Sequence, residues 1–186
     1  MQAILISDKE YQTEAYKRLN QLVTIFLTEK GMKLTETQLD RNDLAFCKGC
    51  FGCWIKKPGE CVISDAMAQI NHGFINSQLA IYLCPVIFGQ FSSNIKNALD
   101  RCIPNILPFF ETRPDGSTMH PARYRSYPKQ IIIGYGDDLS EEDRNLFIDI
   151  TKKHRRNVEV LIYQGNDAEI SQALSQMELK KAGDEL

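Results

Sequence analysis

The sequence Leu79-Ala-Ile-Tyr-Leu-Cys-Pro-Val-Ile-Phe88 lies near the middle of the chain and is apolar at nearly every position. A strand with one face in water would alternate apolar and polar residues, whereas a strand of a parallel sheet, covered by helices on both faces, is apolar throughout. We therefore interpret residues 79–88 as the central strand of a parallel sheet. Such a sheet places the chain in the α/β class, in which strands and helices alternate along the sequence.

The segment before this strand has the pattern of a strand, a helix and a second strand. Residues 3–6 form a short apolar run, Gly31 can supply a left-handed helix cap, and residues 32–39 alternate as a strand does. Between them, from about Thr13, apolar residues recur at helical spacing: Ala15, Leu19, Leu22, Val23, Phe26 and Leu27. This order predicts the first βαβ unit of the sheet.

The segment after the central strand continues the alternation. Ser92 or Ser93 can cap a helix that ends at Pro104, residues 130–134 and 158–163 are further strands, and Asp167 opens a final helix. Residues 140–143 match a capping box, and the basic run 152–156 at the other end of that helix is where the helix dipole favours cations. We interpret this basic run as structural rather than as a phosphate site. Five strands are predicted in total.

In an open parallel sheet, ligands bind beyond the carboxyl ends of the strands, where neighbouring connections diverge. The loops after Ile6, Pro85 and Ile133 are therefore the candidate site. In the middle loop we expect Pro85 to end strand pairing, Gly89 to allow close approach of the backbone, and Phe88 to offer an aromatic face to a planar ring.

Length and composition fit one ordinary globular domain. The chain has 186 residues, of which 43% are hydrophobic and 25% charged, with a net charge of −2 and no concentrated basic face, so nucleic acid is not expected as a partner. The first residues have no basic leader, and their apolar run is too short for a signal peptide or a membrane span. We expect a cytosolic protein with no membrane partner.

Four of the six cysteines, Cys47, Cys50, Cys53 and Cys61, fall within fifteen residues. Three thiols at two-residue intervals, with a fourth close by, suit the corners of an iron-sulfur cluster. A zinc site is an alternative, although zinc more often uses pairs of cysteines on two separate turns. A second alternative is a set of reduced thiols without metal, partly covered by Trp54.

The interval 104–128 holds five of the seven prolines. A long connection in a compact domain is commonly a lid, a binding loop or an interface element, and we interpret this one as a lid or a subunit contact. His120 is the histidine of this interval to test. The chain has no nucleophile elbow, no zinc-protease helix and no Gly-Lys-Ser/Thr phosphate loop, which disfavours hydrolases and nucleoside triphosphatases.

Two stretches resemble a known family. The first, Cys84-Pro-Val-Ile-Phe-Gly-Gln-Phe-Ser-Ser-Asn-Ile-Lys-Asn-Ala-Leu-Asp-Arg101, resembles the central strand, flavin loop and following helix of the NADPH-dependent FMN reductase family. The second is the cysteine segment with Cys61-Val-Ile-Ser-Asp-Ala-Met67, which is similar to a segment of its iron-sulfur flavoprotein branch. The resemblance implies one flavodoxin-like domain over residues 1–186. It would be a three-layer α/β/α sandwich around a five-stranded parallel sheet, with a Cys-rich insertion at about 44–64.

The resemblance also implies a function and its site. FMN would lie at the carboxyl edge of the sheet, with electrons moving between NAD(P)H and a flavin, quinone or iron-sulfur acceptor, and the chain would form a dimer or tetramer. The flavin itself does this chemistry, so no catalytic side chain is assigned. The implied flavin contacts are Ser7, Lys9 and Thr13 for the phosphate, and Pro85, Val86, Ile87, Phe88, Gly89, Gly134, Tyr135 and Gly136 around the ring.

The first loop differs from the family pattern, which has Gly-Ser-Pro-Arg and later Asn-Thr around the FMN phosphate. Here the loop is Ile6-Ser-Asp-Lys-Glu-Tyr-Gln-Thr13, in which Asp8 and Glu10 bring negative charge to that place. Two further hypotheses therefore stand beside the enzyme. One is an electron carrier without catalysis of its own, and the other is a flavin-free relative that acts as a binding module.

Overall fold

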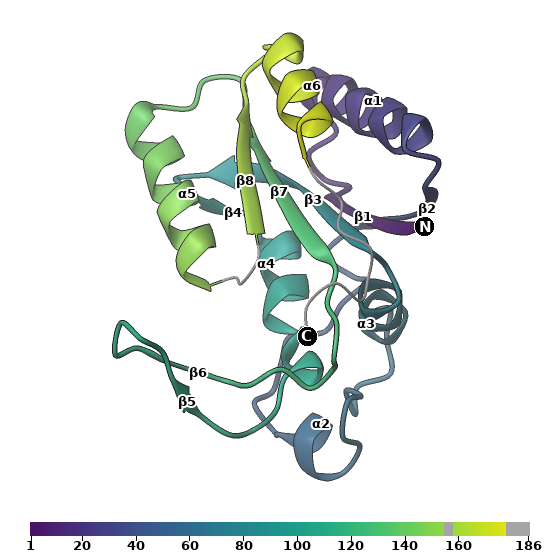
Figure 1. Ribbon diagram of the computed structural model, residues 1–186, viewed down its shortest axis with the longest axis vertical. Coiled ribbons are helices and arrows are strands. Elements are labelled where there is room, and N and C mark those ends of the chain that lie inside the picture. Colours follow the sequence, from purple (N-terminus) through teal and green to yellow (C-terminus); the bar gives the residue numbers. More distant parts are fainter. Residues whose placement is uncertain (155–157, 178–186) are drawn as a thin grey trace.

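The computed structural model of the chain describes residues 1–154 and 158–177. Its main sheet has the order β2-β1-β3-β7-β8, with every one of these strands parallel to its neighbours (Figure 1). The strands are β1 (Gln2–Asp8), β2 (Lys33–Leu39), β3 (Leu79–Ile87), β7 (Lys129–Tyr135) and β8 (Val158–Tyr163). In chain order this is 2-1-3-4-5, the flavodoxin-like arrangement. The predicted fold class is confirmed, and the apolar run from Leu79 forms the central strand.

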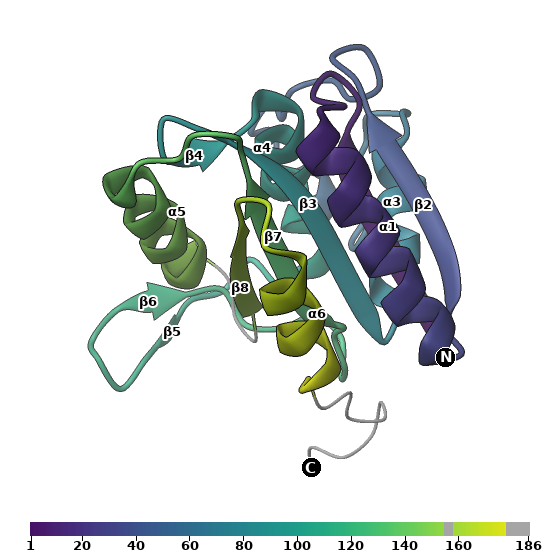
Figure 2. The same ribbon diagram turned by 90° about the horizontal axis from the view of Figure 1, so that it is seen from above.

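Helices cover both faces of the sheet (Figure 2). One face carries α1 (Glu14–Glu29) and α6 (Asp167–Ser175), and the other carries α3 (Met67–Ile75), α4 (Ser93–Asp100) and α5 (Glu141–His154). Successive residues of a strand point to opposite faces, so the residues of β3 divide between the two helical layers: Ile81 and Leu83 pack with α1, while Tyr82 and Cys84 pack with α4 and α5. The result is the predicted three-layer sandwich.

The helix ends explain where two of these helices begin. The Thr13 hydroxyl accepts the backbone N–H of Tyr16 at the start of α1, and the Ser140 hydroxyl accepts the N–H of Asp143 at the start of α5. Ser92 stands at the start of α4, as expected, but its hydroxyl is directed to the Asp8 carboxylate instead of to the helix backbone. The capping position was therefore right, whereas the capping contact was wrong.

Pro85 does not end strand pairing, contrary to the sequence-based expectation. It pairs with Tyr135 of β7, and β3 continues to Ile87 before turning back into β4 (Gln90–Phe91). A proline lacks only the N–H donor. The pairing of β3 with β1 ends at Leu83. At Pro85 no strand of the described ranges is paired with β3 on the side of β1, so a residue without an N–H donor is tolerated there.

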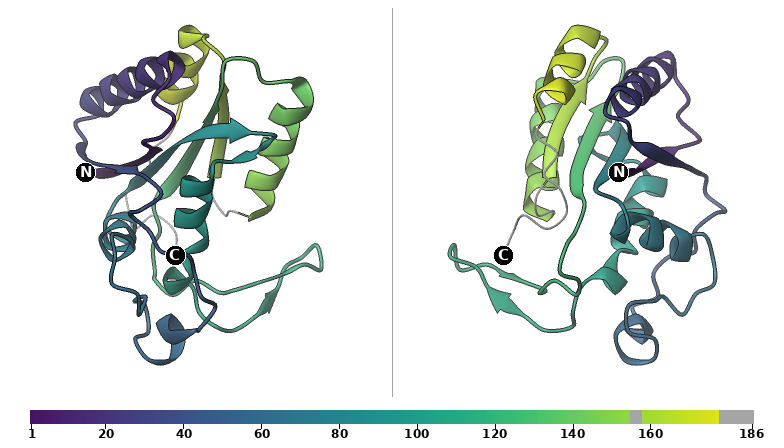
Figure 3. Two further views of the ribbon diagram at one scale, coloured as in Figure 1. Left: turned by 180° about the vertical axis from the view of Figure 1, so that it is seen from behind. Right: turned by 45° about the vertical axis from the view of Figure 1, so that its right-hand side comes forward.

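The cysteine segment (about residues 44–64) and the proline-rich interval (residues 104–128) lie together at the opposite end of the molecule from α1 and α6 (Figure 3). They contain α2 (Gly52–Ile55), the 3-10 helix η1 (Ile103–Asn105) and a hairpin of β5 (Glu111–Thr112) and β6 (Thr118–Met119). The interval 104–128 joins the end of α4 to the start of β7, so it begins and ends at the amino edge of the sheet. The candidate site is at the carboxyl edge, so the position of this interval does not favour a lid over the site of its own chain. A subunit contact remains a proposal.

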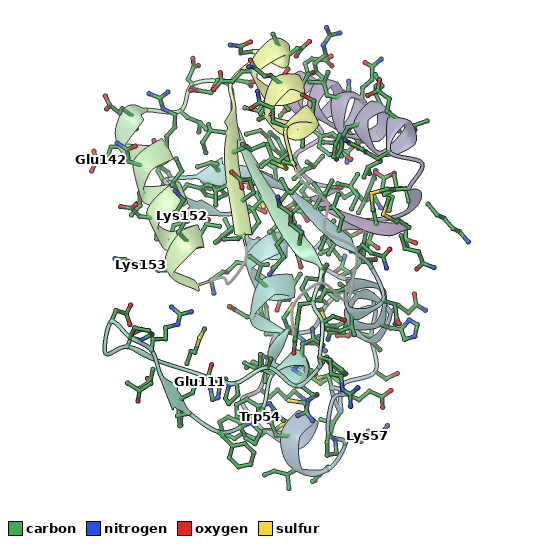
Figure 4. All side chains as sticks on the ribbon, in the orientation of Figure 1. Trp54, Lys57, Glu111, Glu142, Lys152 and Lys153 are labelled. Atoms are coloured by element: carbon green, nitrogen blue, oxygen red, sulfur yellow. The ribbon has the colours of Figure 1, made fainter. Side chains whose placement is uncertain are left out.

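Lys152 and Lys153 of the basic run lie exposed in the last turn of α5, as Figure 4 also shows, while Arg155 and Arg156 lie outside the described residues. Among the helices of the described ranges, none has the length and apolar character needed to cross a membrane.

Candidate functional site

The candidate site is the carboxyl edge of the sheet at β1 and β3. These neighbouring strands are followed by helices on opposite faces, α1 after β1 and α4 after β3. Their connections therefore diverge, and this divergence is the topological position at which open α/β sheets bind ligands.

Asp8, the last residue of β1, is the buried acid at this position. Its side chain is 0% exposed and accepts hydrogen bonds from the Ser92 hydroxyl (2.5 Å), the Asn94 side-chain amide (3.0 Å) and the backbone N–H of Glu10 (3.0 Å). The carboxylate thus joins the end of β1 to the start of α4. Sequence reasoning considered Asp8 only as a source of repulsion, although an acid directly after a buried strand is itself a signal.

Each of the three residues predicted to contact a phosphate already contacts another group of the protein, and Ser7 alone among them is buried. The Ser7 side chain is 0% exposed, and its hydroxyl is 3.3 Å from the Tyr16 hydroxyl. The Lys9 ammonium lies 3.5 Å from the Asp40 carboxylate, and the Thr13 hydroxyl caps α1. The three residues lie in or next to the same loop, but their side chains contact three different groups: the Tyr16 hydroxyl, the Asp40 carboxylate and the start of α1.

The turn after β3 exposes one aromatic ring. Phe88 and Gly89 form the two-residue turn between β3 and β4, with φ angles of 49° and 70°. Positive φ at both positions is typical of the type I′ hairpin turn, and it is costly for a residue as large as phenylalanine. The Phe88 side chain is 90% exposed. Backbone strain of this kind is concentrated at functional sites, so the turn is a candidate contact for a planar ligand.

The other predicted ring contacts of this turn lie deeper. Pro85, Val86 and Gly89 are buried and Ile87 is half-buried. A Cβ atom on Gly89 would come within 2.7 Å of the Leu146 side chain, so this glycine provides close packing of the turn against α5.

The end of β7 is also filled by the protein's own side chains. A Cβ atom on Gly134 would lie 2.8 Å from both Phe147 and Val86, and Tyr135 is 2% exposed with its hydroxyl donating to the backbone oxygen of Tyr11 at 2.9 Å. Burial raises the pKa of Tyr135, and the nearby Cys84 and Asp8 raise it further, so the phenol keeps its proton and remains a donor. Of this group, Gly136 is half-buried and nearest to solvent.

The four clustered cysteines lie on the segment that leads into and out of α2. Cys47 and Cys50 are exposed, and Cys53 and Cys61 are half-buried. Burial raises the pKa of the Cys53 thiol, and the charges of Cys61, Cys47 and Cys50 act in the same direction. Within the described part of the chain, no three Cys, His, Asp or Glu side chains are close enough to form a metal site.

Arg101 anchors this cysteine segment to the sandwich. Its side chain is 1% exposed and donates to both oxygens of Asp65, to the backbone oxygen of Ala45 (2.8 Å) and to the sulfur of Cys61 (3.3 Å). Burial alone would raise the pKa of Asp65, but the hydrogen bonds from Arg101 and from the N–H groups of Ala45 and Met67 hold that pKa below its ordinary value. Sequence reasoning gave Arg101 no role.

Trp54 forms a second anchor (Figure 4). Its indole N–H donates to the backbone oxygens of Ile103 (3.2 Å) and Ile106 (3.0 Å), and its ring stacks with Phe51 and lies 5.0 Å from the ring of His120. The contacts of Trp54 are therefore made largely with residues in and next to the proline-rich interval 104–128. His120 is held in this aromatic contact, with its Nδ1 2.8 Å from the backbone oxygen of Phe109.

The strand order and the helical layers define the fold of this chain as flavodoxin-like. The chain is similar over 94% of its length to an NAD(P)H:quinone oxidoreductase from Methanothermobacter marburgensis, which it covers to 94%, with a TM-score of 0.64 and 12% identity. It resembles an azoreductase from Bacillus anthracis (94% of this chain, 95% of that one, TM-score 0.60, 11% identity). It also resembles a Trp repressor binding protein from Bacillus subtilis (97% and 99%, TM-score 0.55, 14% identity). At these identities the likeness establishes the fold alone.

In sequence, the chain is 31% identical over 77 residues to an iron-sulfur flavoprotein of Methanocaldococcus jannaschii. The match spans 41% of this chain and only 38% of that protein. No protein-family model matches the chain.

Proposed function

We propose that this chain is a flavin-binding oxidoreductase that passes electrons from a reduced nicotinamide, NAD(P)H, to a flavin, a quinone or an iron-sulfur acceptor. The observation that carries the proposal is the exposed ring of Phe88, held in a strained turn that follows the central strand β3 and packs against α5. The similarity to a quinone oxidoreductase, an azoreductase and an iron-sulfur flavoprotein supports the same class of chemistry. FMN is the flavin that the sequence resemblance implies.

The residues at the site fit the ring of a flavin differently from its phosphate. For the ring, Phe88 is exposed, and Ile87 and Gly136 are half-buried. For the phosphate, Ser7, Lys9 and Thr13 are engaged within the protein. A bound flavin would supply the acceptance and release of electrons. The residues of this chain would bind the ring, orient it and exclude water from one side, with no side-chain acid or base assigned.

Replacing Phe88 with alanine tests the proposal. Loss of one aromatic contact should weaken binding of a flavin by up to about tenfold, since such contacts contribute about 0.5–1.5 kcal/mol beyond simple burial. Quenching of flavin fluorescence measures the binding, and disappearance of NAD(P)H absorbance with a quinone acceptor measures the activity. Phe46, which is 77% exposed and lies in the cysteine segment, gives the matched control Phe46→Ala.

Equal flavin affinity of the Phe88→Ala protein and the wild type would remove this residue from the site. A wild-type protein that binds no flavin at all would favour the binding-module hypothesis, whereas flavin binding without NAD(P)H oxidation would favour an electron carrier.

We also propose that Cys47, Cys50, Cys53 and Cys61 are metal ligands, with an iron-sulfur cluster as the group that their soft thiols suit. Their close spacing in the sequence supports this, although the exposed Cys47 and Cys50 have to turn toward the other two. Anaerobic reconstitution with iron and sulfide should give broad visible absorbance and bound iron in the wild type, and Cys53→Ser should lose most of it. Cys102→Ser, at a half-buried cysteine outside the set, is the control. Bound zinc without iron, or no metal, would contradict the cluster.

Two further assignments from the sequence stay proposals. A homodimer or tetramer is proposed on the family resemblance, and light scattering of the purified chain tests it. Cytosolic location is proposed from the reduced cysteines that the sequence predicts.

A further inference from the structure

The first three residues of the loop between β1 and α1 already use their backbone donors within the protein. The N–H of Lys9 donates to the Leu39 oxygen (2.8 Å), that of Glu10 to the Asp8 carboxylate (3.0 Å), and that of Tyr11 to the Asp8 backbone oxygen (3.4 Å). Loops and helix starts that hold phosphate do so with N–H groups directed at the ligand. Here three successive N–H groups are directed at the protein.

The Asp8 carboxylate itself is an internal anion. It is fully buried and collects an N–H from Glu10, an O–H from Ser92 and an N–H from Asn94, a donor set of the kind that a bound phosphate requires. Each of these donors would have to leave a buried carboxylate before it could serve a phosphate, and a buried charge that loses its partners is strongly destabilised.

The nearby cations are paired as well. Arg41 binds Glu10 through its Nε at 2.8 Å, and Lys9 lies 3.5 Å from Asp40. Each of these two cations is therefore matched by one carboxylate, and Asp8 adds a negative charge. A phosphate at this loop would meet a surplus of negative charge.

From these contacts we propose that the flavin site does not recognise the 5′-phosphate, so that the chain binds riboflavin at least as tightly as FMN. The proposal rests on the proposed flavin function and specifies its ligand as the uncharged flavin. Recognition then comes from the ring contacts at the Phe88 turn, while the β1–α1 loop disfavours an anionic tail.

Equilibrium titrations of the full chain with riboflavin and with FMN, at low and at high salt, test the proposal. The wild type should bind riboflavin as tightly as FMN or more tightly. Added salt should strengthen FMN binding, because it screens repulsion, and should leave riboflavin binding unchanged.

The variant Asp8→Asn keeps the shape and one of the two acceptor oxygens while removing the charge. It should improve FMN affinity about tenfold relative to riboflavin, which corresponds to about 1.4 kcal/mol at 25 °C. Asp100→Asn is the matched control, because Asp100 is an exposed acid at the other end of α4, paired with Lys96. Circular dichroism of each variant checks that the fold is kept, and the wild-type comparison stands without any variant.

Tighter binding of FMN than of riboflavin by the wild type overturns the inference and leaves the proposed function standing. Binding of neither flavin by the wild type and by Asp8→Asn overturns the proposed function, and the inference with it.

Discussion

Replacing Arg101 with methionine is expected to lower the free energy of unfolding by about 3–5 kcal/mol, because it leaves the buried Asp65 carboxylate without its counter-charge. Asp65→Asn should cost a similar amount by leaving the guanidinium buried and unpaired. The double variant Arg101→Met with Asp65→Asn should cost clearly less than the sum, since neither charge then remains alone. Urea unfolding followed by circular dichroism measures all three. Additive losses would contradict the ion pair as their cause.

The same pair predicts a dependence on pH. The pKa of Asp65 is lowered in the folded chain, so its contribution to stability is complete above the pKa of the unfolded carboxyl and is lost as pH falls through the lower folded value. The difference in stability between the wild type and Asp65→Asn should therefore shrink below about pH 4. Lys96→Met, which breaks an exposed pair on the same helix, should change stability little at any pH.

The second large effect is expected where Gly134 and Phe147 pack together. Phe147 is 0% exposed and its ring lies 5.0 Å from that of Phe91, so Phe147→Ala should cost about 3–5 kcal/mol. Gly134→Ala places a methyl group 2.8 Å from the Phe147 ring and should cost about 1–3 kcal/mol through overpacking. In the double variant the new methyl group enters space that the ring has left, so the combined loss should be smaller than the sum.

Chemical denaturation of the two single variants and the double variant gives this coupling directly. Gly73→Ala is the matched control, because its new methyl group would meet only the end of the flexible Ile4 side chain, at 3.0 Å. A coupling near zero between Gly134 and Phe147 would mean that the loss in Gly134→Ala comes from its other close neighbours, such as Val86 at 2.8 Å, and not from the Phe147 ring.

The fold was predictable because its signals are local. The apolar run that begins at Leu79 became the central strand, and the final strand, residues 158–163, has the predicted bounds. Pro85 was misjudged because the effect of a proline in a strand depends on which neighbour pairs at that level, and this is set by the length of β1 and not by residues near Pro85.

For the candidate site, the sequence predicted only which loops share one edge of the sheet. The loops after β1, β3 and β7 do meet at one edge, as the order of elements required. The buried polar contacts join residues far apart in sequence: Asp8 and Ser92, at the carboxyl edge, are separated by 84 positions, and Arg101 and Asp65, at the cysteine segment, by 36. No periodicity or spacing in one sequence reports such pairs, so the buried acid and the buried guanidinium emerged only from the three-dimensional structure.

The hydrogen bond from the Tyr135 hydroxyl to the Tyr11 oxygen ties the first loop to β7 across the end of β3. Together with the Asp8 contacts, this hydrogen bond holds the first loop against β7 and the start of α4 before any ligand binds. Binding of a ligand at this edge should then need no slow rearrangement of the loop. The loss of conformational entropy on ordering the loop occurs on folding and does not weaken binding.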